Sequence, residues 1–388
     1  MGVNICVIVG VVFYAAGVGL VTSPTQNTTI PNSEEFQTEI VAPGVEHVTI
    51  RRGDFSAGEA TDRWVIHVLR LDPRLVQLRP AVAMDEIAGA ETTSSIAARY
   101  GAPAAVNGGY FRTAGTYRGE PAGLLARSGK ILSEPNPGRT ALAIANSGEA
   151  IRMAVARMAL TAELIVAGKS ARPIAGFNRP REKDELIVFL PEFHRTTLTT
   201  PDGPEAVVEG RRVIAIRDGE GSTAIPADGF VLSAAGAARA WALDNLKPGA
   251  KVEVRTLLRA EPPFPFEPEF IIGAGPHLLH EGKPIEGQGE VFPEGFYEQR
   301  HPRTAVGIRA DGSVLLVTVD GRQSKTSVGM SIPELAALMA ELGCVEAVNL
   351  DGGGSTTMAV RGRVVNSPSD PAGERPVSDA LLVLPRGH

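Results

Sequence analysis

The sequence predicts an α+β fold built from mixed and antiparallel β-sheets with few helices. Glycine (43 residues) and proline (29) are plentiful among the 388 residues, while aromatic residues make up only 5%, and this composition favours a turn-rich β protein over a helical bundle. Short runs in which apolar and polar residues alternate outnumber the runs with helical periodicity. Because strands dominate and helices are few, we predict the α+β class.

The overall composition limits the classes of partner and site. A formal net charge of −6 and the lack of a long basic run argue against nucleic acid as a partner. The two cysteines, Cys6 and Cys344, cannot build a disulfide framework or a multi-cysteine zinc site. Cys344 precedes an apolar run, and we interpret it as a small core residue rather than a nucleophile. No cofactor and no metal site are predicted.

The N-terminal residues predict export. The segment Val3 to Val21 is apolar and carries no charge, and the residues after it are rich in Ser, Thr, Asn and Pro. We interpret residues 1–21 as a signal peptide or an N-terminal anchor, residues 22–45 as a polar linker, and residues 46–388 as one domain. The protein would then be secreted, or held on the outer side of a membrane through its N-terminal segment alone.

The first half of that domain is predicted to consist mainly of strands. Alternating residues predict strands between Glu46 and Val82, and a short helix is expected over 92–100. A short apolar strand, 104–106, then runs directly into Asn107-Gly108-Gly109. Two hairpins with glycine-containing turns follow.

A mostly β region, about residues 174–260, separates the two halves of the chain. Asp-Gly and Glu-Gly turns divide its strands, and one helix is predicted over 235–246. A proline-rich connector, 261–268, leads back to the remaining strands. We interpret the region as a β-rich insertion within the larger domain.

The strongest local signals lie near the C-terminus. Ser331 and Glu334 have the spacing of a capping box, and the leucines that follow recur with helical period. Gly343 predicts the end of that helix, and residues 345–348 read as a buried strand. The loop Asn349–Thr357 then presents a carboxylate, three glycines and three hydroxyls. Consecutive glycines can form a backbone nest that binds an anion, although a simple tight turn is the alternative.

Two segments of the chain echo each other. Arg139-Thr140-Ala141 is matched by Arg303-Thr304-Ala305, and both triplets begin hairpins. The order helix, strand, asparagine and glycines also occurs twice, over 96–109 and 335–353. Duplication would bring two half-sites to one cleft, and coincidence among common hairpin sequences is the alternative.

Five motifs together resemble the phosphodiester glycosidase family. They are Asn107-Gly-Gly-Tyr-Phe, Pro302-Arg-Thr-Ala-Val-Gly, Val319-Asp-Gly-Arg, Asn349-Leu-Asp-Gly-Gly-Gly-Ser-Thr-Thr and Glu374-Arg-Pro-Val-Ser. The resemblance covers about residues 90–384, and the final hundred residues are similar to the family's secreted bacterial branch. It implies a hydrolase that cleaves a sugar-1-phosphodiester, of the GlcNAc-1-phosphate type, at the glycosidic C–O bond. His277 departs from the family's pattern, in which an aliphatic residue is expected there.

The residues themselves suit that chemistry. Arg139 and Arg303 offer guanidinium forks for the free oxygens of a singly charged phosphodiester. A phosphate monoester is a good leaving group, so one carboxylate that directs water, or stabilises an oxocarbenium-like centre, would suffice. Asp351 is the first candidate for that carboxylate and Asp320 is the second.

The predicted site has a catalytic set and a substrate-binding set. The catalytic set is Asp351, Asp320 and Asn349. The binding set is Asn107, Gly108, Gly109, Arg139, Arg303, Thr304, Gly352, Gly353, Gly354, Ser355 and Thr356. Simpler interpretations exist for several members: Asp320 could belong to an ordinary turn, and Asn107 could adopt a left-handed backbone before two glycines.

Two rival functions remain open from the sequence. A phosphodiesterase would cut the P–O bond instead of the C–O bond. A non-catalytic module would bind phosphorylated envelope polysaccharide or exopolysaccharide without turnover, which the anchor-like N-terminus makes plausible.

Overall fold

The computed structural model describes residues 34–55, 58, 61–148, 150–168, 171–285 and 290–387. The predicted signal peptide or anchor, residues 1–21, lies outside the described residues. Within the described ranges, no helix combines the length and the apolar character needed to cross a bilayer.

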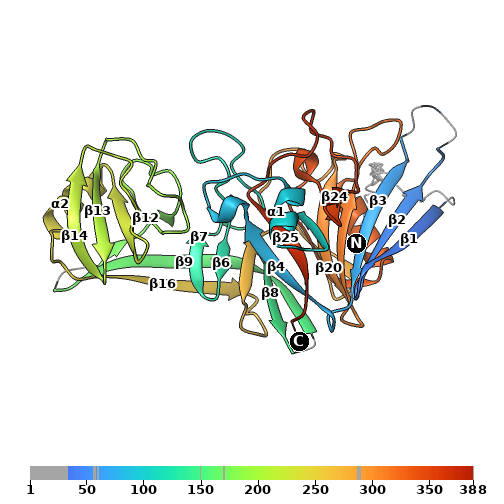
Figure 1. Ribbon diagram of the computed structural model, residues 1–388, viewed down its shortest axis with the longest axis horizontal. Coiled ribbons are helices and arrows are strands. Elements are labelled where there is room, and N and C mark those ends of the chain that lie inside the picture. Colours follow the sequence, from blue (N-terminus) through green and yellow to red (C-terminus); the bar gives the residue numbers. More distant parts are fainter. Residues whose placement is uncertain are drawn as a thin grey trace, which may run out of the picture.

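An eight-stranded antiparallel sheet dominates one end of the molecule (Figure 1). In spatial order its strands are β1 (Glu34–Ala42), β2 (Val45–Arg52), β3 (Trp64–Leu71), β21 (Val314–Val319), β20 (Arg303–Arg309), β22 (Cys344–Asn349), β18 (His277–His280) and β19 (Lys283–Pro284). Helix α3 (Ile332–Glu341) covers one face, where Leu335 and Met339 pack on buried strand residues. The predicted capping box is confirmed, because the Ser331 and Glu334 side chains each bond to the other's backbone N–H. Cys344 is buried, as predicted.

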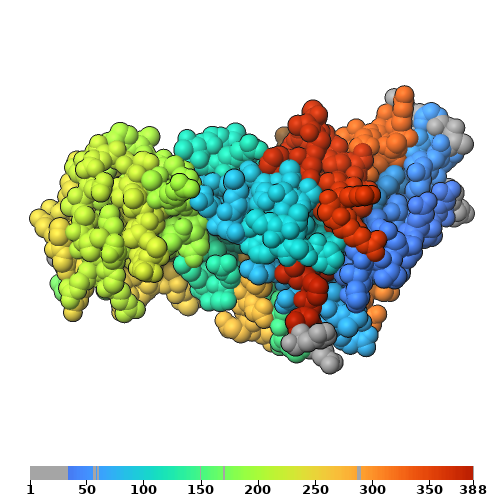
Figure 2. Space-filling model, in the orientation of Figure 1, coloured from blue at the N-terminus to red at the C-terminus, as the bar shows by residue number. Residues whose placement is uncertain are grey.

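A second sheet packs beside the first and carries the other asparagine–glycine loop. Its spatial order is β24 (Arg363–Val364), β23 (Met358–Val360), β5 (Ala104–Asn107), β25 (Asp379–Pro385) and β4 (Val76–Val82). Between β4 and β5 lie the 3₁₀ turn η1 (Ala83–Asp85) and helix α1 (Thr93–Arg99), which packs on β5 and β25. The space-filling view shows the red C-terminal segment lying against the cyan segment near residue 100 (Figure 2).

A third sheet connects this core to a separate lobe. It contains β10 (Arg172–Pro173), β9 (Ala150–Val166), β8 (Thr140–Ser147), β17 (Phe270–Gly273), β6 (Leu125–Arg127) and β7 (Lys130–Ser133), and β16 (Val252–Glu261) pairs with β9. The long β9–β16 ribbon leads to the far end of the molecule (Figure 1). The lobe there contains β11 (Gly176–Phe177), β12 (Leu186–Phe189), β15 (Gly229–Ala234), β13 (Pro204–Glu209), β14 (Arg212–Asp218) and helix α2 (Ala237–Asn245).

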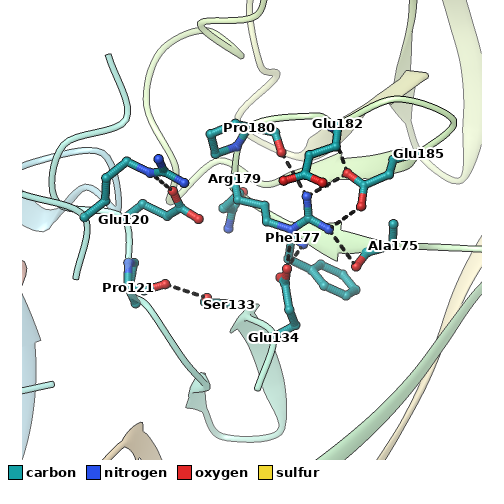
Figure 3. Close-up of polar contacts among 12 residues, drawn as sticks. Glu120, Pro121, Ser133, Glu134, Ala175, Phe177, Arg179, Pro180, Glu182 and Glu185 are labelled. Carbon is teal, nitrogen blue, oxygen red and sulfur yellow. Dashed lines mark hydrogen bonds and ion pairs between the residues drawn. The ribbon is translucent and has the colours of Figure 1, made fainter. Parts of the chain in front are cut away.

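A half-buried arginine, Arg179, joins the lobe to the core (Figure 3). Arg179 follows β11, and its two terminal nitrogens donate to the two Glu185 carboxylate oxygens over 2.7 and 2.9 Å. Its Nε bonds to Glu134, which follows β7 in the core. The second Glu134 oxygen accepts from the Phe177 N–H at 2.8 Å. One guanidinium therefore holds two carboxylates from opposite sides of the junction.

The structure confirms the α+β class, with mainly antiparallel sheets and three α-helices among the described residues. One boundary was wrong. The polar linker predicted over 22–45 extends too far, because residues 34–42 form β1 and pair with β2. This strand lies at the sheet edge and is mostly exposed, so its charged sequence suits an edge strand as well as a linker. The internal duplication and the insertion of the lobe stay predictions.

Candidate active site

Three chain segments meet where strands of two different sheets end. β20 and β22 are antiparallel, so the start of β20 lies beside the loop after β22, and the Leu350 N–H donates to the Thr304 carbonyl at 2.8 Å. The end of β5 approaches from the second sheet, and the Asp351 N–H donates to the Gly108 carbonyl at 3.1 Å. The two asparagine–glycine loops that the sequence singled out are therefore direct neighbours.

Asn107 holds these loops together. Its Nδ2 donates to the Asp351 carbonyl at 2.7 Å, while its Oδ1 accepts from the Thr304 hydroxyl at 2.7 Å and the Thr357 N–H at 3.1 Å. The residue is fully buried. Because both heavy atoms of the amide already bond to the protein, Asn107 and Thr304 position the loops, and the geometry does not support direct contact with a sugar.

The predicted anion nest at Gly108-Gly109 is already filled by a carboxylate of the protein. Asp379, at the start of β25, accepts from the Gly109 N–H at 3.0 Å through Oδ1 and from the Ser378 hydroxyl through Oδ2. A Cβ at Gly108 would lie only 1.8 Å from Asp379 Oδ1, so this approach requires glycine. Burial raises the pKa of Asp379. Sequence reasoning missed this residue, because only strand pairing brings β25 beside β5.

Asp351 has the electrostatics of an acid–base group. It is partly exposed, and its Oδ1 accepts from the Gly352 N–H at 2.9 Å. Burial raises the pKa of Asp351 to about 6, against the lowering effects of the Ser355 hydroxyl, the Gly352 N–H and the charge of Arg375. A carboxylate with this pKa can exchange a proton near neutral pH.

Tyr110 and Asn349 form a hydrogen-bonded pair beside Asp351. The Asn349 Nδ2 donates to the Tyr110 hydroxyl at 2.8 Å and to the Gly275 carbonyl at 2.9 Å, and the Tyr110 hydroxyl donates to the same carbonyl at 2.7 Å. Burial, followed by the negative charge of Asp351, raises the pKa of Tyr110, which keeps its phenol protonated. The buried Asn349 Oδ1 has no hydrogen-bond partner in the described part of the chain. Tyr110 belongs to the Asn107-Gly-Gly-Tyr-Phe motif, and that motif was the signal for it.

The two predicted arginines have different surroundings. Arg303 is buried: its Nε donates to the Met330 carbonyl at 2.8 Å, and its Nη2 donates to the Phe296 and Gln299 carbonyls at 3.0 and 2.9 Å. Its Nη1 makes no hydrogen bond with any described residue, and burial lowers the pKa of Arg303 to about 10. The predicted bidentate fork therefore reduces to one available nitrogen.

Arg139 is half-buried at the rim of the site. Its guanidinium carbon lies 3.7 Å from the Phe292 ring centroid and 5.4 Å from that of Tyr110. Its Nε donates to the Val291 carbonyl at 3.2 Å. Stacking on two aromatic rings holds the charge beside Tyr110 while leaving it accessible.

Two further arginines flank the glycine loop after β22. A Cβ at Gly353 would lie 3.0 Å from Arg322 Nη2, and one at Gly354 would lie 2.2 Å from Arg375 Nη2. Arg375 is held by Asp370 through its Nε at 2.7 Å. Both arginines belong to recognised motifs, but no local sequence signal places them at this loop.

Most backbone N–H groups of the glycine loop already donate hydrogen bonds to acceptors of the protein. Gly352 donates to the Asp351 carboxylate, Gly353 donates to the Pro302 carbonyl at 2.8 Å, and Ser355 and Thr356 donate to carbonyls within the loop. The buried Thr356 hydroxyl has no partner within the described ranges, and the Ser355 hydroxyl accepts from Arg375 at 3.4 Å. An anion at this loop would therefore depend more on arginine side chains than on a backbone nest.

Asp320 is buried in a different set of contacts. Its Oδ1 accepts from the Ser367 N–H at 2.9 Å and from Asn366 at 3.2 Å, and its Oδ2 lies 3.8 Å from His67 Nε2. Asn366 also donates to the Thr356 carbonyl at 3.1 Å. Asp320 thus contacts the glycine loop indirectly, through Asn366, and the geometry favours Asp351 as the reactive carboxylate.

Part of the chain matches a known protein family. Residues 202–384 match the model of the phosphodiester glycosidase family. These residues belong to that family. The matched range includes Asp351 and its arginines, whereas Asn107 and Tyr110 precede it.

Individual relatives match shorter stretches or the whole fold. YomE, an SPbeta prophage-derived protein of Bacillus subtilis (strain 168), is 38% identical over 106 residues, which are 27% of this chain and 16% of that protein. The mouse N-acetylglucosamine-1-phosphodiester alpha-N-acetylglucosaminidase is 38% identical over 68 residues, or 18% of this chain and 13% of that enzyme. The matched segments are thus a small part of both curated relatives.

A solved structure covers nearly the whole chain. A protein of Burkholderia pseudomallei K96243, whose name proposes that it is exported, superposes with a TM-score of 0.80 at 26% identity. The match covers 92% of this chain and 98% of that one.

Proposed function

We propose that this protein is an exported hydrolase that cleaves a sugar-1-phosphodiester, of the GlcNAc-1-phosphate type, at the glycosidic C–O bond. The observation that carries the proposal is Asp351, whose pKa is raised to about 6 at a loop flanked by Arg322 and Arg375. The family of residues 202–384 and the name of the mouse relative support this substrate class.

In the proposed complex, arginines neutralise the phosphodiester. Arg375 and Arg322 approach the glycine loop, and Arg303 contributes its remaining nitrogen, Nη1. Arg139 adds positive charge at the rim, beside Tyr110. Planar guanidinium groups suit phosphate oxygens, so a singly charged diester fits a site with several of them.

Asp351 is proposed to direct water to the anomeric carbon. Near pH 7 most of its carboxylate is ionised, since its pKa is about 6. Water forms the new C–O bond and loses its proton to Asp351, while the C–O bond to the phosphate oxygen breaks. The phosphate monoester leaves as an anion that the arginines stabilise, which reduces the need for a general acid. The hydrogen bond between Asn349 and the protonated Tyr110 keeps these two side chains in place beside Asp351.

The test is hydrolysis of a GlcNAc-1-phosphodiester in oxygen-18 water by the purified full chain. We expect the label in the released sugar, and we expect Asp351→Asn to lose turnover while keeping most of its substrate binding. Asp311→Asn, at an exposed turn of the β20–β21 hairpin, is the matched control and should behave as wild type.

Each rival function predicts a different result. Label in the phosphate would assign the protein to the phosphodiesterases. Saturable binding of the substrate without turnover would assign it to the non-catalytic binding modules.

Export is proposed from the composition of residues 1–21 and is supported by the name of the Burkholderia protein. N-terminal sequencing of the protein recovered from outside the cytoplasm separates the two forms. A new N-terminus after residue 21 identifies a cleaved signal peptide, and an intact Met1 identifies an anchor.

A further inference from the structure

Two histidines and a glutamate meet on the edge of the large sheet. His277 and His280 come from β18 and Glu346 comes from the neighbouring strand β22. Glu346 Oε2 lies 2.9 Å from His277 Nε2, and Glu346 Oε1 lies 2.5 Å from His280 Nδ1. One potential ligand atom from each of the three residues lies within 4.8 Å of the others.

A β-bulge explains how the two histidines share a face. Residues three apart on a regular strand point to opposite sides of the sheet. Here His277 pairs with Val348 and Leu279 pairs with Ala347, so β18 contains one more residue than β22 across this step. The extra residue turns His280 to the same side as His277. Glu346 and Val348 are two apart on β22, so Glu346 also faces that side.

The donor set suits a first-row transition metal. Two imidazole nitrogens and one carboxylate oxygen are the protein ligands of many open zinc sites, in which water occupies the fourth position. Tetrahedral ligands about 2.0 Å from zinc lie about 3.3 Å apart, so small side-chain rotations would bring these atoms to the required spacing. The His280 side chain is 60% exposed, which leaves the site open to solvent and to an entering ion.

We propose that His277, His280 and Glu346 bind one divalent transition-metal ion, and that Zn²⁺ is the ion best suited to them. The prediction of no metal site overlooked the spacing of His277-Leu278-Leu279-His280. The proposal concerns a site separate from Asp351 and does not depend on the hydrolase activity.

A bound ion would also stabilise the pairing of β18 with β22 next to the candidate active site. Gly275, two residues before His277, donates its N–H to the Asn349 carbonyl at 2.8 Å. Asn349, three residues after Glu346, donates its N–H to the Pro276 carbonyl at 3.1 Å. Cross-linking β18 to β22 would therefore stabilise the backbone on which Asn349 is held.

The test is Zn²⁺ binding by the full chain, stripped with chelator and free of any affinity tag, in competition with a chromogenic chelator. We expect one Zn²⁺ per chain and a rise in melting temperature with zinc. His280→Ala removes a mostly exposed side chain, so it should fold normally and weaken zinc binding at least about 100-fold, more than the loss of an outer-sphere partner does. Glu346→Gln should weaken binding similarly.

His194→Ala is the matched control. His194 faces Glu86 at 3.9 Å, but these two are not part of any three-ligand group among the described residues. This variant should bind zinc as wild type does. Failure of the wild type to bind zinc, or equal binding by wild type and His280→Ala, would show that the three side chains form only a hydrogen-bonded cluster.

Discussion

Replacing Asp351 with asparagine should stabilise the protein at neutral pH while removing its activity. Raising this pKa from 3.8 to about 6 means that the folded protein resists ionisation of the carboxyl group. Each tenfold change in proton affinity corresponds to about 1.36 kcal/mol, so the ionised side chain lowers the free energy of unfolding by an amount on the order of 3 kcal/mol. Asparagine is never charged, and its Oδ1 can still accept from the Gly352 N–H.

The sign of the pH dependence follows from the direction of the pKa change. Below about pH 4 the carboxyl group is protonated in both states, and Asp351→Asn should have little effect. As the pH rises from about 4 to about 6, the unfolded state ionises first, and the wild type loses stability relative to the variant. Above pH 6 the difference should stay near its maximum.

Urea unfolding of both proteins at a series of pH values between 4 and 8 measures this difference directly. Asp311→Asn is the control, because the pKa of Asp311 is lowered by hydrogen bonds from Ser313 and the group is exposed. A difference between wild type and Asp351→Asn that does not change with pH would refute the assigned environment of Asp351. It would also remove the main support for its role as a base.

Three further predictions concern Asp351, Gly108 and the arginine at the lobe junction. The value of kcat/KM should rise with pH and level off above about 6, being about tenfold lower at pH 5, because Asp351 must be ionised; a profile flat from pH 5 to 8 would contradict this. Gly108→Ala should lower the free energy of unfolding by about 1–3 kcal/mol, because its Cβ would clash with buried Asp379; unchanged stability in urea would argue against this packing. Arg179→Ala should cost about 2–3 kcal/mol by leaving two carboxylates unpaired at the lobe junction, whereas Arg255→Ala, at an exposed pair, should leave stability unchanged.

Local signals predicted much of the secondary structure. The capping box at Ser331 and Glu334 defined the start of α3, and alternation identified the strands between residues 46 and 82. These features depend on neighbours a few residues apart, so sequence spacing contains the information. The linker prediction failed for residues 34–42 because a solvated edge strand and a polar linker have similar composition.

Candidate site residues were harder to assign because their roles depend on partners far along the chain. Gly108-Gly109 has the sequence of an anion nest, but its partner is Asp379, which strand pairing brings from 270 residues away. Arg303 has the sequence of a phosphate ligand, but most of its donors bond to the carbonyls of residues 296, 299 and 330.

The fold class, the approximate order of the elements and the candidate loop around Asp351 could be predicted from the sequence. These depend on turn chemistry, hydrophobic periodicity and recognisable motifs, all of which are local. The three-dimensional structure was needed to show which carboxylate lies beside the arginines, which glycines face a protein group, and that a bulge aligns His277 with His280. Burial, charge and hydrogen bonding depend on distances in space, and strand pairing sets those distances between residues that are remote in sequence.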